Sequence, residues 1–375
     1  MHLYICRLFA ILASLLTTPG LAKGTGLDPA PCRIDAEASI IVLRDCTTES
    51  RRDGALLRNF IHLQWEGTRP SQHVLGLGMP HPKVAQVRQS GPDEAPHAVS
   101  DSIDASVLLN IGPDTPAAQR PPPGLQLGVP LQLHPGLNRI EVLAQPLGTP
   151  IRLPEARLYT DAAWQNWNAE RAFQSGALLG VLLMLLAALG LAYALGREPS
   201  YPPYAALTLS YVLGILHLSG HLQPAFWQHA PALNLRILPW ISLSVALSHG
   251  AFAITFLRLR ERQRWAYRAL ITVMVLLTLS HVAIPQHLLV SLTLFGIGEA
   301  LIAVIAVSAV ATRLPGALWY AAGSAAFAVF AIGLFGVSCL GFNPWPAIYL
   351  MDYFRIGCLL EIICFCGAQV LRVLD

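Results

Sequence analysis

Long apolar segments dominate the second half of the sequence. Nearly all of them fall after Phe173, and an α-helix of about 20 such residues crosses roughly 30 Å of hydrocarbon. The chain is 54% hydrophobic and only 13% charged, whereas soluble proteins have about 25% charged residues. We predict membrane-spanning helices over seven ranges: 172–195, 204–222, 237–257, 266–284, 287–311, 317–340 and 346–371. The predicted fold class is a membrane all-α seven-helix bundle preceded by a smaller exported domain.

The first 22 residues have the pattern of a secretory signal peptide. Arg7 precedes an apolar stretch over 8–16, and small residues end the segment at 20–22. This apolar stretch is shorter than the roughly 20 residues that a bilayer requires. We therefore expect cleavage after Ala22 and export of the residues that follow.

Residues 23–160 have the pattern of a small periplasmic all-β domain. Short apolar or alternating runs are separated by turn-rich segments such as Gly91-Pro92-Asp93, at intervals typical of an antiparallel sandwich. The expected strands are 39–43, 59–65, 74–77, 106–111, 129–133, 139–144 and 151–158. We predict a jelly-roll-like sandwich, followed by an interfacial linker over 161–171. Tyr159, Trp164 and Trp167, with Arg171, are expected to form an aromatic and charged collar at the membrane interface.

The exported region contains few candidates for chemistry. Cys32 and Cys46 are expected to form a disulfide, because the periplasm is oxidising. Trp65 is expected in the core, with a ligand-binding face as the alternative. Five scattered histidines have no metal-ligand spacing, and we predict no cofactor: His62, His73, His81, His97 and His134.

Arginine distribution predicts the orientation. Arg171 and Arg236 flank the outer side, whereas most other arginines near the spans fall in loops that alternate to the inner side. The predicted inner set is Arg197, Arg258, Arg260, Arg262, Arg264, Arg268, Arg313 and Arg372. The expected location is the bacterial inner membrane, with a periplasmic amino-terminal domain and a short cytoplasmic tail at 372–375.

The chain is expected to contact the lipid bilayer and not nucleic acid. A formal charge of +3 is too small for the basic stripe that nucleic acid requires. The segment 258–268 is interpreted as a topology determinant that contacts anionic lipid, or alternatively as a docking site for a partner.

Ionisable residues inside membrane spans are costly and therefore indicate functional sites. One candidate group lies toward the outer ends of the spans and could line a cavity: His217, His221, His281, His287, Asp352 and Arg355. Four of these, His217, His221, His281 and Asp352, could form a tetrahedral metal site, although hydrogen-bonded histidines and an Asp352–Arg355 pair explain them without a metal. A second candidate is a deeper polar cluster of His249, Glu299 and Glu361 that joins helices or changes its arrangement during signalling.

Several segments resemble the bacterial seven-transmembrane receptors with diverse intracellular signalling modules. They are Phe173-Gln174-Ser175-Gly176, Tyr211-Val212-Leu213, Phe252 to Leu259 and Gly357-Cys358-Leu359-Leu360-Glu361, with His134 to Arg139 at the end of the exported region. The resemblance implies a receptor whose periplasmic jelly roll binds a carbohydrate-like ligand and whose helices relay the signal. The usual output domain after the last helix is not found in this sequence, so we expect a separate cytoplasmic or membrane signalling partner.

Three functions remain open on the sequence alone. The chain is expected to be a receptor-like sensor and not an enzyme. An intramembrane hydrolase that uses the outer histidines and Asp352 to activate water on a metal is the second hypothesis, although the sequence has no Gly-x-Ser-x-Gly motif. The third is an accessory anchor subunit of an envelope assembly.

Overall fold

The computed structural model describes a β-rich region and a helical region. The described residues are 32–34, 39–43, 47–53, 56–77, 84–90, 106–111, 127–145, 156–219, 221–226, 231–283, 288–335 and 350–374. The predicted signal peptide and Cys46, and with it the predicted disulfide, lie outside these residues.

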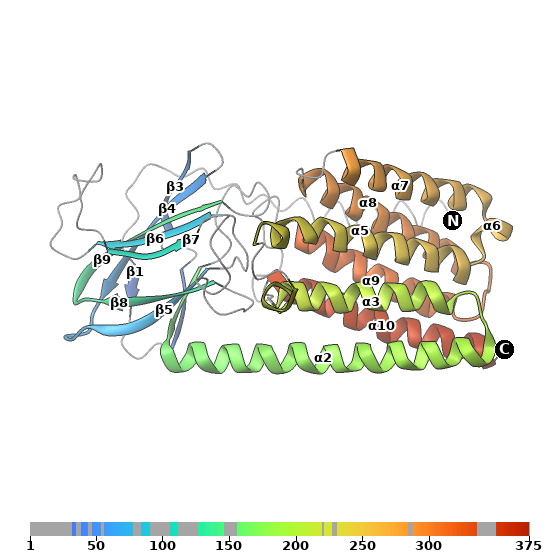
Figure 1. The fold of residues 1–375 in the computed structure, drawn as a ribbon, viewed down its shortest axis with the longest axis horizontal. Helices are drawn as coiled ribbons and strands as arrows, with labels where there is room; N and C mark the ends of the chain where they lie inside the picture. Colours follow the sequence, from blue (N-terminus) through green and yellow to red (C-terminus); the bar gives the residue numbers. More distant parts are fainter. Residues whose placement is uncertain are drawn as a thin grey trace. The chain divides into compact units, whose positions relative to one another are not determined.

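Two sheets form the β-rich region (Figure 1). The larger, six-stranded sheet has the order β1 (Cys32–Ile34), β4 (Leu56–Trp65), β9 (Gly136–Gln145), β6 (Val84–Ser90) and β7 (Ser106–Ile111), with β3 (Thr47–Asp53) also paired to β4. The four-stranded sheet has the order β2 (Ile40–Val42), β10 (Arg157–Thr160), β5 (Ser71–Leu77) and β8 (Leu127–Leu133). All these pairs are antiparallel except β1 with β4.

A single hydrophobic core joins the two sheets. Alternate residues of β8 are buried, as the period of two in a half-buried strand requires. They share one core with residues of β4 and β9, such as Leu63 and Val142. Trp65 belongs to this core and is only 5% exposed, which agrees with the expectation of a core tryptophan.

Three strands have no counterpart in the sequence prediction. β1 has three residues, and β3 has the sequence TTESRRD, which contains no apolar alternation. β6 alternates Val and Ala with Gln and Arg, and only Ala85, Val87 and Gln89 of its described side chains are buried. Pairing with the longer strand β4 stabilises β1 and β3, whereas β6 also contributes Ala85 and Val87 to the core.

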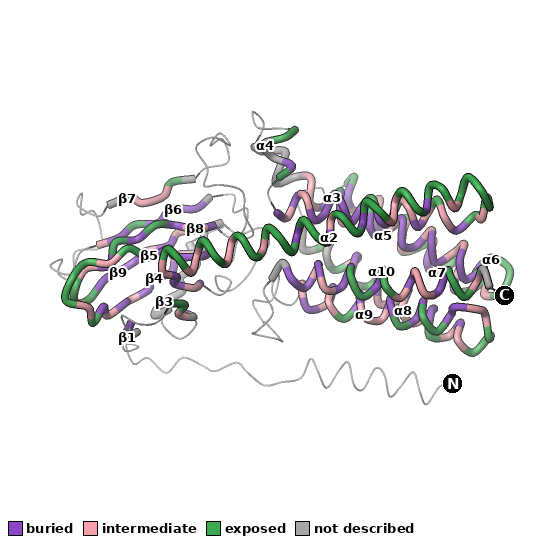
Figure 2. The backbone as a smooth tube through the Cα atoms, turned by 90° about the horizontal axis from the view of Figure 1, so that it is seen from below, coloured by how far each residue is buried: buried purple, intermediate pink, exposed green. Residues whose placement is uncertain are grey.

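Long helices lie side by side with nearly parallel axes in the helical region, as both Figure 1 and Figure 2 show. They are α2 (Asp161–Gly196), α3 (Tyr201–Leu218), α5 (Pro231–Phe256), α7 (Arg264–Ala283), α8 (Leu288–Val310), α9 (Ala317–Phe335) and α10 (Leu350–Leu374). Two short helices, α4 (Leu222–Phe226) and α6 (Leu259–Arg262), lie between them in sequence. Six helices, all of the long ones except α3, are long and apolar enough to cross a membrane.

α2 and α3 differ in what surrounds them. α2 is exposed along most of its length (Figure 2), which suits a helix whose side chains face lipid. Half of the residues of α3 are buried, including the polar side chains of Thr208, Ser210 and His217. Contact with α2 and α5 provides these polar groups with a protein environment, so α3 tolerates a less apolar sequence than its neighbours.

α2 starts earlier than the predicted span. Thr160 ends β10 and caps α2, because its Oγ1 accepts a hydrogen bond from the backbone N–H of Ala163 at 3.3 Å. Asp161 lies in the first turn, where an acidic side chain is favourable. Residues 161–171, expected as a linker, are therefore helical and continuous with the span.

Candidate functional site

A fully buried polar cluster joins three helices. His249 of α5 lies between Glu299 of α8 and Glu361 of α10, and their exposed fractions are 0%, 1% and 0%. The Nδ1 atom of His249 is 2.7 Å from Glu299 Oε2, and its Nε2 atom is 3.4 Å from Glu361 Oε1. Each ring nitrogen thus faces a different carboxylate.

Hydroxyl groups from two further helices complete this cluster. Tyr211 of α3 donates a hydrogen bond to Glu361 Oε2, and Ser324 Oγ of α9 is 3.5 Å from His249 Nε2. We refer to His249, Glu299, Glu361, Tyr211 and Ser324 as the buried cluster. Each of its members comes from a different helix, so its arrangement depends on how all five helices pack.

Two carboxylate oxygens of the buried cluster lack hydrogen bonds. Glu299 Oε1 and Glu361 Oε1 are buried without a hydrogen-bond partner, and no Lys or Arg of the described part of the chain forms an ion pair with either glutamate. An unpaired buried oxygen of an ionised carboxylate is costly, because neither water nor a donor compensates its charge.

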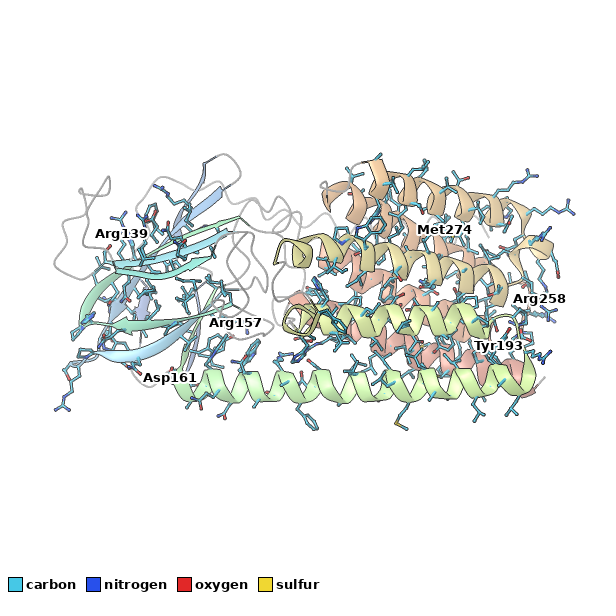
Figure 3. The ribbon with its side chains drawn as sticks, in the orientation of Figure 1. Arg139, Arg157, Asp161, Tyr193, Arg258 and Met274 are labelled. Carbon is cyan, nitrogen blue, oxygen red and sulfur yellow. The ribbon has the colours of Figure 1, made fainter. Side chains whose placement is uncertain are left out.

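Aromatic rings and close helix contacts separate the buried cluster from solvent. The rings of Tyr320, Phe327 and Phe365 lie between 5.6 and 6.3 Å from the His249 ring, centroid to centroid. A Cβ at Gly250, the residue after His249, would lie 2.6 Å from Met274 Sδ of α7, which Figure 3 labels. Glycine at this position therefore permits α5 and α7 to approach each other beside the histidine.

A second ionic group joins the first and last long helices. Asp352 of α10 pairs with Arg171 of α2, whose Nη1 is 2.5 Å from Asp352 Oδ2, and with Arg355 of α10 at 3.6 Å. Arg355 also donates a hydrogen bond to Ser175 Oγ of α2. We refer to Arg171, Ser175, Asp352 and Arg355 as the latch. Its pairs are only partly accessible, since the side chains of Arg171 and Asp352 are 23% and 13% exposed.

Stacked aromatic rings connect the latch to the last strand of the β-rich region. The ring of Tyr159 in β10 is 5.3 Å from that of Trp164, which stacks on Trp167 at 5.5 Å. The Arg171 guanidinium lies over the Trp167 ring, 5.6 Å from its centroid. These residues form the predicted collar, with Tyr159 contributed by a buried strand.

Three of the predicted outer histidines, His217, His221 and His281, lie on or directly after α3 and α7. His281 is buried, with Nδ1 2.8 Å from the carbonyl oxygen of Leu277 and Nε2 2.8 Å from that of Pro239. His217 is buried on α3 and His221 is exposed after it, while His287 lies outside the described residues. No group of three or more His, Cys, Asp or Glu side chains in the described residues is arranged to hold a metal.

The sequence alone did not show which residues pair with one another in the buried cluster and in the latch. Ser175 and Tyr211 fall inside the segments that carry the family resemblance, and this was their only signal. Arg171 was assigned to the collar and not to Asp352, and Ser324 had no distinguishing pattern. Hydroxyl groups are frequent in membrane helices, so a hydroxyl alone identifies no site.

The opposite ends of the helices are rich in arginine. Arg372 of α10 is 2.8 Å from Glu198, and its guanidinium lies 5.1 Å from the centroid of the Phe256 ring. Figure 3 labels Arg258 and Tyr193 at this same end of the helical region. Arg197, Arg258 and Arg313 adopt left-handed backbone conformations there, with φ between 50 and 54°.

The β-rich region also presents a polar face, formed by the residues of β4 and β9 that point away from the core. Arg139 lies over the Phe60 ring at 4.7 Å, and Arg58 is 3.2 Å from Glu141; Figure 3 labels Arg139. The hairpin between β8 and β9 is closed by Asn138, whose amide donates to the carbonyls of His134 and Gly136. Asn138 belongs to the segment from His134 to Arg139 that the sequence comparison with the receptor family singled out.

Comparison with known proteins identifies the helical region. The model of the family described as 7TM diverse intracellular signalling matches residues 171–368, which are more than half of the chain and run from Arg171 of the latch to Ala368 of α10. No curated protein and no solved structure matches the chain. The chain is therefore a member of the 7TM diverse intracellular signalling family of sensor-like multi-pass membrane proteins.

Proposed function

We propose that this protein is a receptor-like sensor of the bacterial inner membrane. Its β-rich region binds a periplasmic ligand, and its helices relay the bound state to a separate signalling partner in the cytoplasm or membrane. One observation carries the proposal: a continuous series of contacts runs from Tyr159 of β10 through Trp164, Trp167 and Arg171 to Asp352 of α10.

The junction between β10 and α2 supports the first step of this relay. Tyr159 is completely buried, and its strand pairs with both β2 and β5. Thr160 ends the strand and caps the helix, so no flexible loop separates them. A shift of β10 on ligand binding would therefore move the first turn of α2 and the collar with it.

α10 supports the second step. It contacts α2 at its outer end through Asp352, and at its other end Arg372 contacts Glu198 and Phe256. A helix is stiff along its axis, so a change in the latch is transmitted over the length of α10. The bistable element of the proposal is the position of α10 relative to α2, to which the side chains of the latch connect it.

The arginines support the orientation. Arg197, Arg258, Arg313 and Arg372 all belong to the end opposite the latch, and loops rich in arginine face the cytoplasm. In this orientation the β-rich region and the latch are periplasmic. The proposal includes α3 as the seventh span, because α3 connects α2 to α5 and packs against both.

The ligand class rests on the family resemblance, which implies a carbohydrate-like molecule. The face that contains Arg139, Arg58 and Glu141 suits such a ligand, because it presents partly exposed charged hydrogen-bonding groups, with Arg139 packed over the buried Phe60 ring.

The experiment uses the full-length chain in lipid nanodiscs, screened by thermal shift against a library of glycans and metabolites, since a ligand of the folded state raises the melting temperature. A binding compound should change hydrogen exchange in the outer half of α10. In Asp352→Asn the compound should still raise the melting temperature, but α10 should no longer respond. Glu170→Gln, an exposed acid beside Arg171, is the matched control and should behave like the wild type.

A library in which no compound shifts the melting temperature, combined with a normal cellular phenotype after deletion of the β-rich region, would contradict the proposal. A ligand that binds without any change in α10, in the wild type, would argue for an accessory anchor subunit instead.

A pull-down of the tagged chain in mild detergent tests the partner. Arg260, Arg262 and Trp265 are exposed in the arginine-rich segment, and a stoichiometric kinase or cyclase lost from Arg260→Gln/Arg262→Gln would place docking there. If the same double variant keeps its protein partners but no longer binds anionic vesicles, the segment contacts lipid instead.

A further inference from the structure

We propose that the buried cluster is a proton-binding site, in which Glu361 holds an exchangeable proton while His249 and Glu299 form an ion pair. This site goes beyond ligand sensing, since it requires neither the periplasmic ligand nor the cytoplasmic partner.

The first argument is the charge balance. Two carboxylates and one imidazole are fully buried, so two ionised glutamates beside a protonated histidine would leave one uncompensated negative charge. An uncompensated charge inside a membrane protein is strongly unfavourable. One additional proton removes this charge, and the described residues offer no Lys or Arg in contact with the cluster that would do so.

The geometry assigns this proton to Glu361. Glu299 lies 2.7 Å from His249 Nδ1, a distance typical of a charge-assisted hydrogen bond, whereas Glu361 Oε1 lies 3.4 Å from Nε2. The other oxygen of Glu361 accepts from Tyr211, a neutral donor. The histidine therefore compensates Glu299 more closely than Glu361, and Glu361 is the carboxylate that holds the proton.

Several groups face the cluster, but apart from His249 and Glu299 none of those in the described residues is an acid or base of suitable strength. From α3 they are Tyr204 and Tyr211, from α5 His249, from α8 Glu299, from α9 Tyr320 and Ser324, and from α10 Cys358 and Cys366. Tyrosine and cysteine ordinarily stay neutral at physiological pH. With His249 and Glu299 held as an ion pair, exchange of one proton with solvent changes the charge of Glu361 alone.

Release of the proton would alter helix packing. An ionised Glu361 would attract His249 away from Glu299, and this changes contacts between α10, α5 and α8. Any ligand or partner that favours one packing of α10 would then change proton affinity, and by linkage the proton would change the affinity for that ligand or partner.

The test is infrared difference spectroscopy of the full-length chain in nanodiscs. A protonated carboxylic acid gives a C=O band separate from those of carboxylates and amides. We expect such a band at neutral pH, its loss in Glu361→Gln, and its retention in Asp352→Asn, a matched change of the other acid on α10. Glutamine keeps the shape and accepts from Tyr211, so Glu361→Gln should fold.

A second measurement addresses a bound metal cation. The melting temperature is compared in sodium chloride and choline chloride at equal ionic strength, without any ligand. Equal values, together with the Glu361 band, support the proton site. Absence of a band removed by Glu361→Gln would overturn the proposal, as would a sodium-dependent melting temperature that Glu361→Gln abolishes. Neither readout depends on signalling, so the sensor proposal can fail while this one stands, and the reverse.

Discussion

α10 takes part in two ionic groups that differ in composition and in contact with water. The latch combines one carboxylate, Asp352, with the guanidinium groups of Arg171 and Arg355, and it is partly exposed. The buried cluster combines two carboxylates with one histidine and is closed to solvent. The two groups are nine residues apart, Asp352 to Glu361, or about 14 Å along the helix.

Because of this difference, the latch suits a role in positioning the helices, and the buried cluster suits a role as a switch. Arginine does not lose its proton in proteins, so the two guanidinium groups of the latch, Arg171 and Arg355, stay positively charged. In the proposed proton site of the buried cluster, gain or loss of one proton on Glu361 alters a charge that water does not screen. A latch of fixed charges suits a mechanical connection, and a titratable buried cluster suits a change of state.

The largest effect is expected in the buried cluster. His249→Leu removes the cationic partner of Glu299 and leaves that carboxylate buried and unpaired. The expected loss of stability is roughly 3–5 kcal/mol, measured by thermal or denaturant unfolding in detergent. His221→Leu, a change of an exposed histidine, should unfold like the wild type. Comparable stability of the two variants would show that His249 does not form an ion pair.

A smaller effect is expected in the latch, where water partly compensates a lost partner. Arg171→Met and Asp352→Asn should each destabilise the chain, and the double variant should lose less than the sum of both. The coupling energy from this cycle should be about 1–2 kcal/mol, as for residues in one ion-pair network. A coupling energy near zero would mean that the latch does not join α2 to α10, and it would remove the support for the relay.

The residues of the buried cluster were easier to predict than their partners. His249, Glu299 and Glu361 stand out in the sequence because ionisable residues in apolar helices are rare and costly. Their mutual contacts depend on the rotation of each helix about its own axis, which the nearly uniform apolarity of these helices does not fix. The same limit applies to the cavity expected for His217, His281 and Asp352, which stays a prediction. Their heights in the membrane follow from the sequence, and the structure adds that His281 lies against the Pro239 carbonyl and Asp352 against Arg171.

The β-rich region was predictable where strands alternate. β4, β5, β8 and β9 all overlap expected ranges, because one face of each contributes to the common core. β1 and β3 stabilise the edges of a sheet through backbone pairing to β4, and backbone pairing is independent of side-chain pattern. The jelly-roll topology stays a prediction.

His73 in the β-rich region is a useful contrast to His249, because it is also buried but has no hydrogen bond to a carboxylate. Burial lowers the pKa of His73 from 6.5, and its ring packs edge-on against Trp65 at 5.3 Å. Below 6.5 the unfolded chain therefore binds more protons than the folded one, and stability falls as the pH decreases toward the folded pKa. Hydrogen exchange of β5 should become faster, relative to His73→Leu, as the pH passes below 6.5. Equal pH dependence in both proteins would show that His73 is not responsible, and His221→Leu should follow the wild type.

The smallest expected effect concerns arginine used for its position and not for an ion pair. Arg313 follows α8 with a φ of 54° and is exposed, a conformation that costs a residue with a Cβ roughly 1 kcal/mol relative to glycine. Its charge near the C-terminus of α8 offsets a few tenths of that cost. Arg313→Gly should therefore raise the unfolding free energy by about 0.5 kcal/mol, whereas Arg313→Ala, which loses the same charge but keeps the Cβ, should lower it slightly. If the two variants have the same melting temperature, Arg313 does not hold backbone strain at the end of α8. Its charge would then be the reason for an arginine at this position, as the charge of Arg171 is in the latch.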